Sequence, residues 1–379
     1  MTYDHIVVGA GIVGAATARA LAESGSSVLL VEAFERGHDR GSSHGASRIF
    51  RHGYVDRDYV ELSLRARDGW RELESASGQR ILELTGAIDH GDPGTVSAIE
   101  AALAEAGLPT ERLTADAGAA RWPGLHFETD VLFAPSGGRL RADVAVEAML
   151  TVAERAGAEL RFSAPVEQLE VTDAGVAVTV GGDRIEARGL VVAAGSWTPA
   201  LIGDWLAAQG SPLPAVRVTE EQPAHFPERP VAEHPDAGSA HFDWPSFVHY
   251  REPGADGVAS PGVYGLLTPG EGVKVGLHGN GPTVDPSNRD RTIDPVRLAQ
   301  LTAYVAEWVP GVDAAAPSPI SCLYDNTGTE DFVLDRVGPV TVATGFSGHG
   351  FKFGPVLGDL LAALALHGTP APERFRLPR

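Results

Sequence analysis

The chain of 379 residues contains a single cysteine, Cys322, and relatively few basic side chains. One cysteine excludes a disulfide within the chain and is typical of proteins that work in a reducing compartment, so we expect a cytoplasmic protein. The 50 aspartate and glutamate residues outnumber the 30 lysine and arginine residues, which gives a formal net charge of −20. Nucleic acids and anionic membrane surfaces would repel such a chain, and we expect neither as a partner.

The sequence also lacks long apolar runs, zinc-ligand spacing and hydrolase motifs. None of its apolar stretches approaches the roughly 20 residues that a membrane-spanning helix needs. No basic leader precedes the first apolar stretch, Ile6 to Val8, so we expect no cleaved signal peptide. The thirteen histidines show no paired spacing with acids or with the cysteine, and no nucleophile elbow is present. We therefore expect no metal site and no serine or cysteine hydrolase.

The amino-terminal segment carries a glycine motif between two predicted strands. Tyr3 to Val8 predicts a buried strand, Ala15 to Ser24 a helix, and Ser27 to Val31 a second strand, which Glu32 closes. Between the first strand and the helix lies the sequence Gly9-Ala10-Gly11-Ile12-Val13-Gly14. A strand, a glycine turn, a helix, a strand and an acid in this order form the dinucleotide-binding fingerprint in the context that it requires.

Each glycine of this motif has a physical task. Gly9 permits the tight turn, Gly11 lets the backbone approach a pyrophosphate, and Gly14 lets the helix pack against the strand. The free amide groups at the start of the helix then face the diphosphate. Glu32 can accept hydrogen bonds from a ribose, and its charge would repel a 2′-phosphate. The motif by itself does not decide between NAD and FAD.

The rest of the chain alternates between helix-rich and strand-rich segments. Helical periodicity predicts helices at residues 58–77, 96–105, 142–156 and 356–367. Apolar or alternating runs predict strands at residues 175–180, 189–194, 246–251, 272–279 and 340–344. Prolines and glycines are frequent between Val216 and Ala316, where we expect an antiparallel sheet.

This order predicts an α/β fold with added antiparallel β-structure. We expect a Rossmann-like nucleotide-binding domain made of residues 1–78, 142–213 and 318–379. A substrate domain built on a mixed or antiparallel sheet, residues 79–141 and 214–317, would be interleaved with it.

Several motifs resemble those of one flavoprotein family and follow its order and spacing over nearly the whole chain. They are Val7 to Gly14, Gly41 to His52, Arg121 to Gly124, Lys274 to His278, Cys322 to Tyr324 and Gly345 to Phe353. The chain resembles the monomeric sarcosine oxidases and N-methyltryptophan oxidases, within the larger group of D-amino-acid-oxidase-like flavoproteins. The resemblance implies a monomer that binds FAD rather than NAD. It further implies a flavin tethered by a thioether from Cys322 to the 8-methyl group of the isoalloxazine ring.

From the fingerprint and the resemblance together we expect a defined set of cofactor-binding residues. They are Gly9, Gly11, Ile12, Val13, Gly14, Glu32, Ala33, Ser42, His44, Arg48, Val166, Gly195, Trp197, Cys322, Gly348, Gly350, Phe351 and Lys352. Gly195 belongs to a second turn, after a predicted strand, where the backbone can approach a nucleotide.

The expected catalytic residues are Lys274, His278, Arg48, Tyr324 and Tyr264. Alternation with period two puts Lys274, Gly276 and His278 on one face of a strand. We expect this face to lie over the flavin, with Gly276 leaving room for the ring or the substrate. The resemblance implies that Lys274 promotes oxygen activation and that His278 and the two tyrosines line the substrate pocket. A positive charge suits this place, because oxygen gains negative charge as it is reduced.

Arg48 and Arg51 form a basic cluster in an acidic chain. Three residues apart, they share a face if the segment is helical and diverge if it is extended. The resemblance implies that Arg51 and Lys352 hold the substrate carboxylate and that Arg48 lies near the flavin. A planar guanidinium can bind a carboxylate through two parallel hydrogen bonds. Lys352 and the loop from Gly345 to Gly354 would also stabilise negative charge on the reduced flavin.

We therefore expect an FAD-dependent oxidase of N-methyl amino acids such as sarcosine, which yields an imine, then an aldehyde and an amino acid, and hydrogen peroxide. The sequence has no second fingerprint for a nicotinamide nucleotide, so oxygen is the simplest electron acceptor. Residues 216–241 depart from the family pattern, which leaves two alternatives, a fructosyl-amino-acid oxidase and an oxidase of cyclic imino acids such as pipecolate or proline. A flavin dehydrogenase with a protein or quinone acceptor is an alternative from another class. A non-catalytic FAD-binding subunit is disfavoured, because Lys274, Cys322 and Lys352 are all present.

Overall fold

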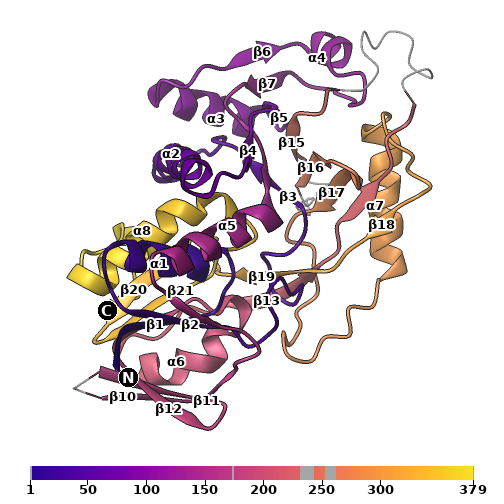
Figure 1. The fold of residues 1–379 in the computed structure, drawn as a ribbon. Coiled ribbons are helices and arrows are strands. Elements are labelled where there is room, and N and C mark those ends of the chain that lie inside the picture. The colour runs from indigo at the N-terminus through magenta and orange to yellow at the C-terminus, as the bar shows by residue number, and fades with distance from the viewer. Residues whose placement is uncertain (1, 173–174, 231–242, 252–261, 379) are drawn as a thin grey trace.

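The computed structural model describes residues 2–172, 175–230, 243–251 and 262–378. Within these ranges two eight-stranded sheets lie in different parts of the molecule, and helices pack on both (Figure 1). The part of the divergent segment at residues 231–241 lies outside the described residues. Among the residues that the structure describes, no helix combines the length and the apolar character that crossing a membrane requires.

The first sheet has a parallel core in which β1 lies between β2 and β12. Its strands are β1 (Thr2–Val8), β2 (Val28–Val31), β9 (Glu159–Arg161), β10 (Val166–Thr172), β11 (Gly175–Val180), β12 (Asp183–Val192), β20 (Val333–Val337) and β21 (Val340–Thr344). Strand β9 pairs in parallel with β2, and β21 pairs in parallel with the carboxyl-terminal end of β12. The carboxyl ends of parallel strands lie at one edge of a sheet, so Gly9, Glu32, Ala193 and Gly345 come to the same edge.

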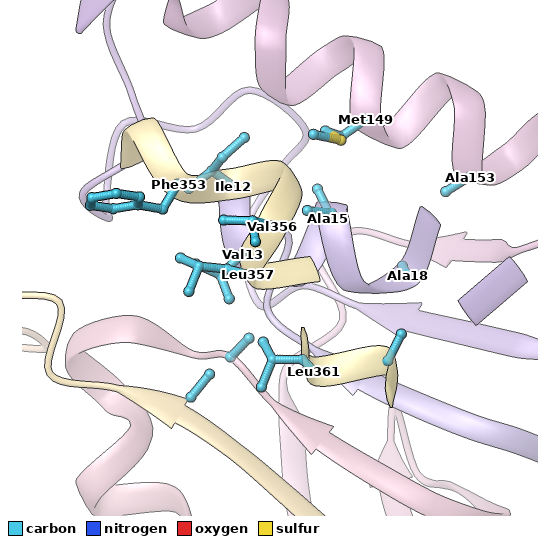
Figure 2. Close-up of a cluster of buried hydrophobic side chains, with 14 of the residues drawn as sticks. Ile12, Val13, Ala15, Ala18, Met149, Ala153, Phe353, Val356, Leu357 and Leu361 are labelled. Atoms are coloured by element: carbon cyan, nitrogen blue, oxygen red, sulfur yellow. The ribbon is translucent and has the colours of Figure 1, made fainter. Parts of the chain in front are cut away.

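Helices and an antiparallel meander cover the two faces of this sheet. Helices α1 (Ile12–Glu23), α5 (Ala142–Arg155) and α8 (Gly354–His367) pack on one face, and α6 (Thr198–Ala208) with β10 and β11 packs on the other. Figure 2 shows side chains of α1 and α8 packed together. At this contact a Cβ on Gly358 would lie 2.6 Å from the Ala16 carbonyl group, so only glycine allows the two helices to approach so closely.

One face of the second sheet packs on a helix, and its other face carries Lys274. Its strands are β5 (Ala87–Gly91), β6 (Glu111–Leu113), β7 (Val131–Ala134), β14 (Ala224–Phe226), β15 (Ser246–Tyr250), β16 (Val263–Thr268), β17 (Gly272–Leu277) and β18 (Ser318–Pro319). Neighbouring strands run antiparallel except β5 and β15. Val273 and Val275 pack in a core with helix α7 (Pro295–Trp308). The alternation along β17 therefore leaves Lys274 on the opposite face, as the sequence predicted.

Shorter elements join the two sheets. Two small ribbons combine β3 (Ser47–Phe50), β4 (Leu82–Glu83) and β8 (Gly138–Arg141) in one, and β13 (Arg217–Glu221) and β19 (Cys322–Asn326) in the other. The connecting helices are α2 (Arg57–Ser77), α3 (Pro93–Glu105) and α4 (Ala115–Arg121), with 3-10 turns at Gly195–Trp197, Phe351–Phe353 and Glu373–Phe375. The N-cap of helix α2 is Asp56, whose side chain accepts from the Asp58 amide. Its C-cap is Gly78, in the left-handed conformation.

The predicted fold class is confirmed: a Rossmann-like sheet is combined with a mixed sheet that is largely antiparallel. Three helix starts were predicted too late by two residues or more. Helix α3 begins at Pro93 rather than Val96, because Asp92 is its N-cap and accepts from the Thr95 amide. Helix α1 begins at Ile12 rather than Ala15, because Gly11 is already the N-cap and the motif's last residues are helical. Helix α8 begins at Gly354 rather than Val356, with Pro355 in its first turn, where proline leaves no helical hydrogen bond unmade.

Acid stability depends on histidines that the fold keeps neutral. His52 is fully buried, its Nδ1 lies 2.7 Å from Ser63 Oγ, and burial together with the Arg67 charge lowers its pKa to about 4. The unfolded chain binds this proton near pH 6.5, so the contribution of His52 is complete above pH 6.5 and is lost as the pH falls towards 4. We predict that His52→Asn flattens the acid side of the stability profile by up to about 1.4 kcal/mol per pH unit. Urea unfolding at pH 7, 6 and 5 measures this, and parallel profiles would contradict it.

Candidate active site

A cavity of about 1000 Å³ lies between the two sheets. It is lined at the edge of the first sheet by the turn from Gly9 to Val13 and by Glu32, and by β15, β16 and β17 of the second sheet. This volume is at the upper end of the range of about 300–1,000 Å³ that is typical of small-molecule and cofactor sites. One cavity therefore joins the fingerprint to the predicted catalytic residues.

The fingerprint end of the cavity fits a dinucleotide. Helix α1 has no side-chain cap at Gly11, and Ser43 Oγ accepts from the Ile12 amide at 3.0 Å. Gly9 has a φ of +103°, and a Cβ on Gly14 would lie 1.9 Å from the Gly9 carbonyl oxygen. The turn is thus as tight as the motif predicts, and the positive end of the helix faces the cavity.

The acid that closes β2 is held for hydrogen bonding. Glu32 is buried, and its carboxylate accepts from the Ala10 amide at 2.7 Å and from the Phe34 amide at 3.1 Å. Burial opposes ionisation, but His38 and these amides bring the pKa of the carboxyl below its usual value. Glu32 therefore carries its negative charge at neutral pH and can accept from the hydroxyl groups of a ribose.

With one exception, the predicted cofactor residues line this cavity. The exception is Gly14, which contacts the strand instead. The residues on the cavity wall are Gly9, Gly11, Ile12, Val13, Glu32, Ala33, Ser42, His44, Arg48, Val166, Gly195, Trp197, Cys322, Gly348, Gly350, Phe351 and Lys352. Their individual roles stay predictions.

The single cysteine lies among positive groups. Cys322 Sγ is 3.7 Å from His44 Nε2, and both residues line the cavity with Lys274 and Arg48. Burial alone would raise the pKa of the Cys322 thiol, but Lys274, His44 and Arg48 lower it to about 6. Burial and the Arg48 charge in turn lower the pKa of Lys274 to about 8. Cys322 is therefore a thiolate at neutral pH, which is the nucleophilic form.

The two arginines of the basic cluster diverge. Because β3 is extended, Arg48 and Arg51 do not share a face. The Arg48 guanidinium donates to the carbonyl oxygens of Ser42 at 2.8 Å and His44 at 2.6 Å, beside the cysteine. Backbone carbonyls satisfy this cation without neutralising it.

Arg51 and Lys352 meet at Tyr54. Lys352 Nζ donates to Tyr54 Oη at 2.8 Å and to the His349 carbonyl oxygen at 2.7 Å, and Arg51 Cζ lies 4.6 Å from the centre of the Tyr54 ring. Burial and the Arg51 charge hold the pKa of Lys352 well below its usual value. Two cations are thus brought together in a buried place, where an anion would stabilise both.

The partners of these cations were not among the predicted site residues. Tyr54, Asp89 and Tyr250 lie outside the family motifs. His349 lies within the motif from Gly345 to Phe353, but no role was predicted for it. One signal was present in the sequence: Asp89 directly follows the apolar residues Ala87 and Ile88, and a charged residue is rare in a buried strand unless it is paired.

The tyrosines and the histidine of the predicted pocket lie together. Tyr264, Tyr324 and His278 all line the cavity, and the His278 and Tyr324 rings are 5.4 Å apart. Burial, with the charges of Arg51 and Lys352, lowers the pKa of His278 to about 4, so it is neutral at physiological pH.

The expectation that Gly276 leaves room for the flavin or the substrate was wrong. A Cβ on Gly276 would lie 2.6 Å from Tyr264 Oη, so the space above this glycine holds the Tyr264 side chain. The two residues pair across β16 and β17, which explains the contact. Gly276 makes room for a pocket tyrosine.

A model of the FAD dependent oxidoreductase family matches residues 4–364. The chain belongs to this family. It is 35% identical to a monomeric sarcosine oxidase of Streptomyces avermitilis, over 98% of this chain and 95% of that protein. It is 31% identical to an N-methyl-L-tryptophan oxidase of Salmonella arizonae, over 100% of this chain and 99% of that protein. These relatives confirm the resemblance that the motifs indicated.

Solved structures of FAD-dependent oxidoreductases share the fold. NikD, an unusual amino acid oxidase essential for nikkomycin biosynthesis, has a TM-score of 0.84 and 26% identity, covering 99% of this chain and 97% of its own. Glycine oxidase from Geobacillus kaustophilus has a TM-score of 0.77 at 20% identity, which shows the fold alone. Membership of the family confirms FAD over NAD.

The glycine turn gives a test of the cofactor site. We predict that Gly14→Ala loses bound FAD, because the new methyl group would collide with the Gly9 carbonyl 1.9 Å away and displace the turn. Gly328→Ala is the matched control, since a Cβ there has nothing within 4 Å. The ratio of flavin absorbance to protein absorbance after purification measures the effect. Equal flavin content in the two variants would contradict the assignment of the turn.

Proposed function

We propose that this FAD-dependent oxidase, which acts on CH–NH bonds, takes N-methyl amino acids such as sarcosine and passes their electrons to oxygen. The observation that carries the proposal is the convergence of Arg51 and Lys352 on Tyr54, in the same cavity as Lys274 and Cys322. Partly buried Arg51 and buried Lys352 would form a site for a carboxylate, and Lys274 would place a further charge where oxygen reacts.

The residues around the carboxylate site would orient the substrate. Arg51 and Lys352 bind its carboxylate, while Tyr264, Tyr324 and neutral His278 surround the amine and keep water away. No side chain needs to act as a strong base when the amine binds in its neutral form. FAD, when bound, accepts the two electrons. The CH–NH unit loses two electrons and two protons to become an imine, water hydrolyses the imine, and oxygen takes up the electrons and protons as hydrogen peroxide.

The proposal extends to the organisation of the protein. The first sheet with its helices (residues 1–78, 142–213 and 318–379) would form the FAD-binding domain, and residues 79–141 and 214–317 the substrate domain. We propose a cytoplasmic monomer, in line with the single cysteine and with the relative that is named monomeric.

A screen for hydrogen peroxide release tests this function. Sarcosine, N-methyl-L-tryptophan, proline, pipecolate and a fructosyl amino acid are each supplied to the purified flavoprotein, and an N-methyl amino acid is expected to give the fastest release. Faster release with the fructosyl or cyclic substrate would move the assignment to one of those alternatives. Reduction of an added quinone without peroxide would indicate a dehydrogenase instead.

We predict that FAD is bound covalently to Cys322. The lowered thiol pKa of about 6 provides the thiolate that a thioether bond requires. The thiolate sulfur bonds to the methyl carbon, which loses one proton, and the step releases two electrons, which oxygen takes up. After acid precipitation, yellow colour should stay in the pellet of the natural protein and pass to the supernatant in Cys322→Ser. Flavin in both supernatants would disprove the linkage and leave FAD binding itself intact.

A second prediction concerns Lys274. Lys274→Met should slow the reaction of the reduced enzyme with oxygen about 100- to 1,000-fold and affect reduction by substrate much less, because one charge at a developing anion is lost. Its pKa of about 8 means that the charge is present below pH 8 and lost above it, so the oxygen reaction of the natural enzyme should slow as the pH rises through 8. Stopped-flow absorbance separates the two half-reactions. An unchanged oxygen reaction in the variant would remove this role.

A further inference from the structure

Behind Arg51 lies a carboxylate that is not part of the cavity wall. Asp89 on β5 is 1% exposed, does not line the cavity, and its Oδ1 lies 3.5 Å from Arg51 Nη1. Tyr250 on β15 joins the two: its hydroxyl accepts from Arg51 at 3.1 Å and donates to Asp89 at 2.9 Å. Strands β5 and β15 pair in parallel, which fixes this relay in the sheet.

Three ionisable groups therefore meet at the carboxylate site: Arg51, which is partly buried, and Lys352 and Asp89, which are buried. Burial raises the pKa of the Asp89 carboxyl, and the Arg51 charge and the Tyr250 hydroxyl oppose this. The two nearby histidines do not change the balance, because burial keeps His278 and His349 neutral by lowering the pKa of each. Glu330 also lines the cavity, but it is exposed at the rim, where water screens its charge.

We propose that Asp89 is a specificity-determining residue that limits the Arg51 and Lys352 site to a single carboxylate. Burial and the Arg51 charge lower the pKa of Lys352, and a carboxylate in the site favours its charged form. With both cations then charged, Asp89 balances one of them, and the substrate carboxylate balances the other. A second carboxylate would enter a desolvated place without a cation of its own, which is unfavourable because a buried charge needs a partner.

The inference rests on the proposed function and narrows it. The substrates would be secondary amines with one carboxylate, and dicarboxylates such as iminodiacetate or N-methylaspartate would be rejected. Asp89 acts through Arg51 and Tyr250, so it is a positioning and charge-balancing residue and has no contact with the reacting atoms.

Calorimetric titration of the FAD-loaded protein with three four-carbon ligands tests this. Butyrate carries one carboxylate, succinate carries two, and butyramide carries none, so their affinities separate charge from size. The natural protein should bind butyrate at least about 10-fold more tightly than succinate and should bind butyramide weakly. Asp89→Asn keeps the shape and an acceptor oxygen for Tyr250 but removes the charge, and it should raise the ratio of succinate affinity to butyrate affinity about 10-fold or more.

Tyr250→Phe is the matched control. It breaks the hydrogen-bonded relay and keeps the Asp89 charge, so it should weaken butyrate and succinate alike and leave their ratio unchanged. A ratio that moves as much in Tyr250→Phe as in Asp89→Asn would overturn the proposal, because positioning of Arg51 would then explain both.

Two further results would overturn it even if Asp89→Asn failed to fold. These are equal affinities of the natural protein for butyrate and succinate, and no binding of either. None of these titrations requires turnover. Lack of peroxide release would therefore count against the proposed function, and the ligand ratio alone would count for or against Asp89.

Discussion

Positive charge buried beside a cavity is the constraint on which the rest of this structure depends. A cation removed from water is stable only where the protein supplies partners, and the four cations here have different ones. Backbone carbonyls hold Arg48, a tyrosine and a carboxylate hold Arg51, and a hydroxyl and a carbonyl hold Lys352. Lys274 lies beside a thiol whose pKa it lowers. The partners decide what each cation can do.

The distribution of charge also explains how an acidic protein can attract anions. The chain has a formal net charge of −20, yet the cavity wall carries Arg48, Arg51, Lys274 and Lys352. The wall also carries acids, among them Glu32 and Glu330, so an anion is attracted locally, where these cations lie. His278 also lines the pocket, and because its pKa is lowered to about 4 it contributes no charge at neutral pH.

The sequence predicted what is encoded locally. The glycine motif, the acid at the end of β2 and the alternation in β17 each depend on a few consecutive residues, and the structure has them as expected. The family motifs located Arg51 and Lys352. Their partners could not be predicted, because the relay from Arg51 through Tyr250 to Asp89 joins three distant segments through strand register. The space above Gly276 was assigned wrongly for the same reason: Tyr264, which fills it, becomes a neighbour only through the pairing of β16 with β17.

The close contact of Gly358 with Ala16 joins two helices that are synthesised at different times. Helix α1 is synthesised long before α8, the helix that covers it. At about 5–20 residues per second, translation of the intervening chain takes tens of seconds. Throughout that time the apolar face of α1 has no partner from α8, and the edge that holds Gly9 lacks β21 beside β12. Until α8 and β21 are synthesised, the nascent chain exposes apolar surface to which chaperones can bind, and the edge of the sheet at the flavin site is incomplete.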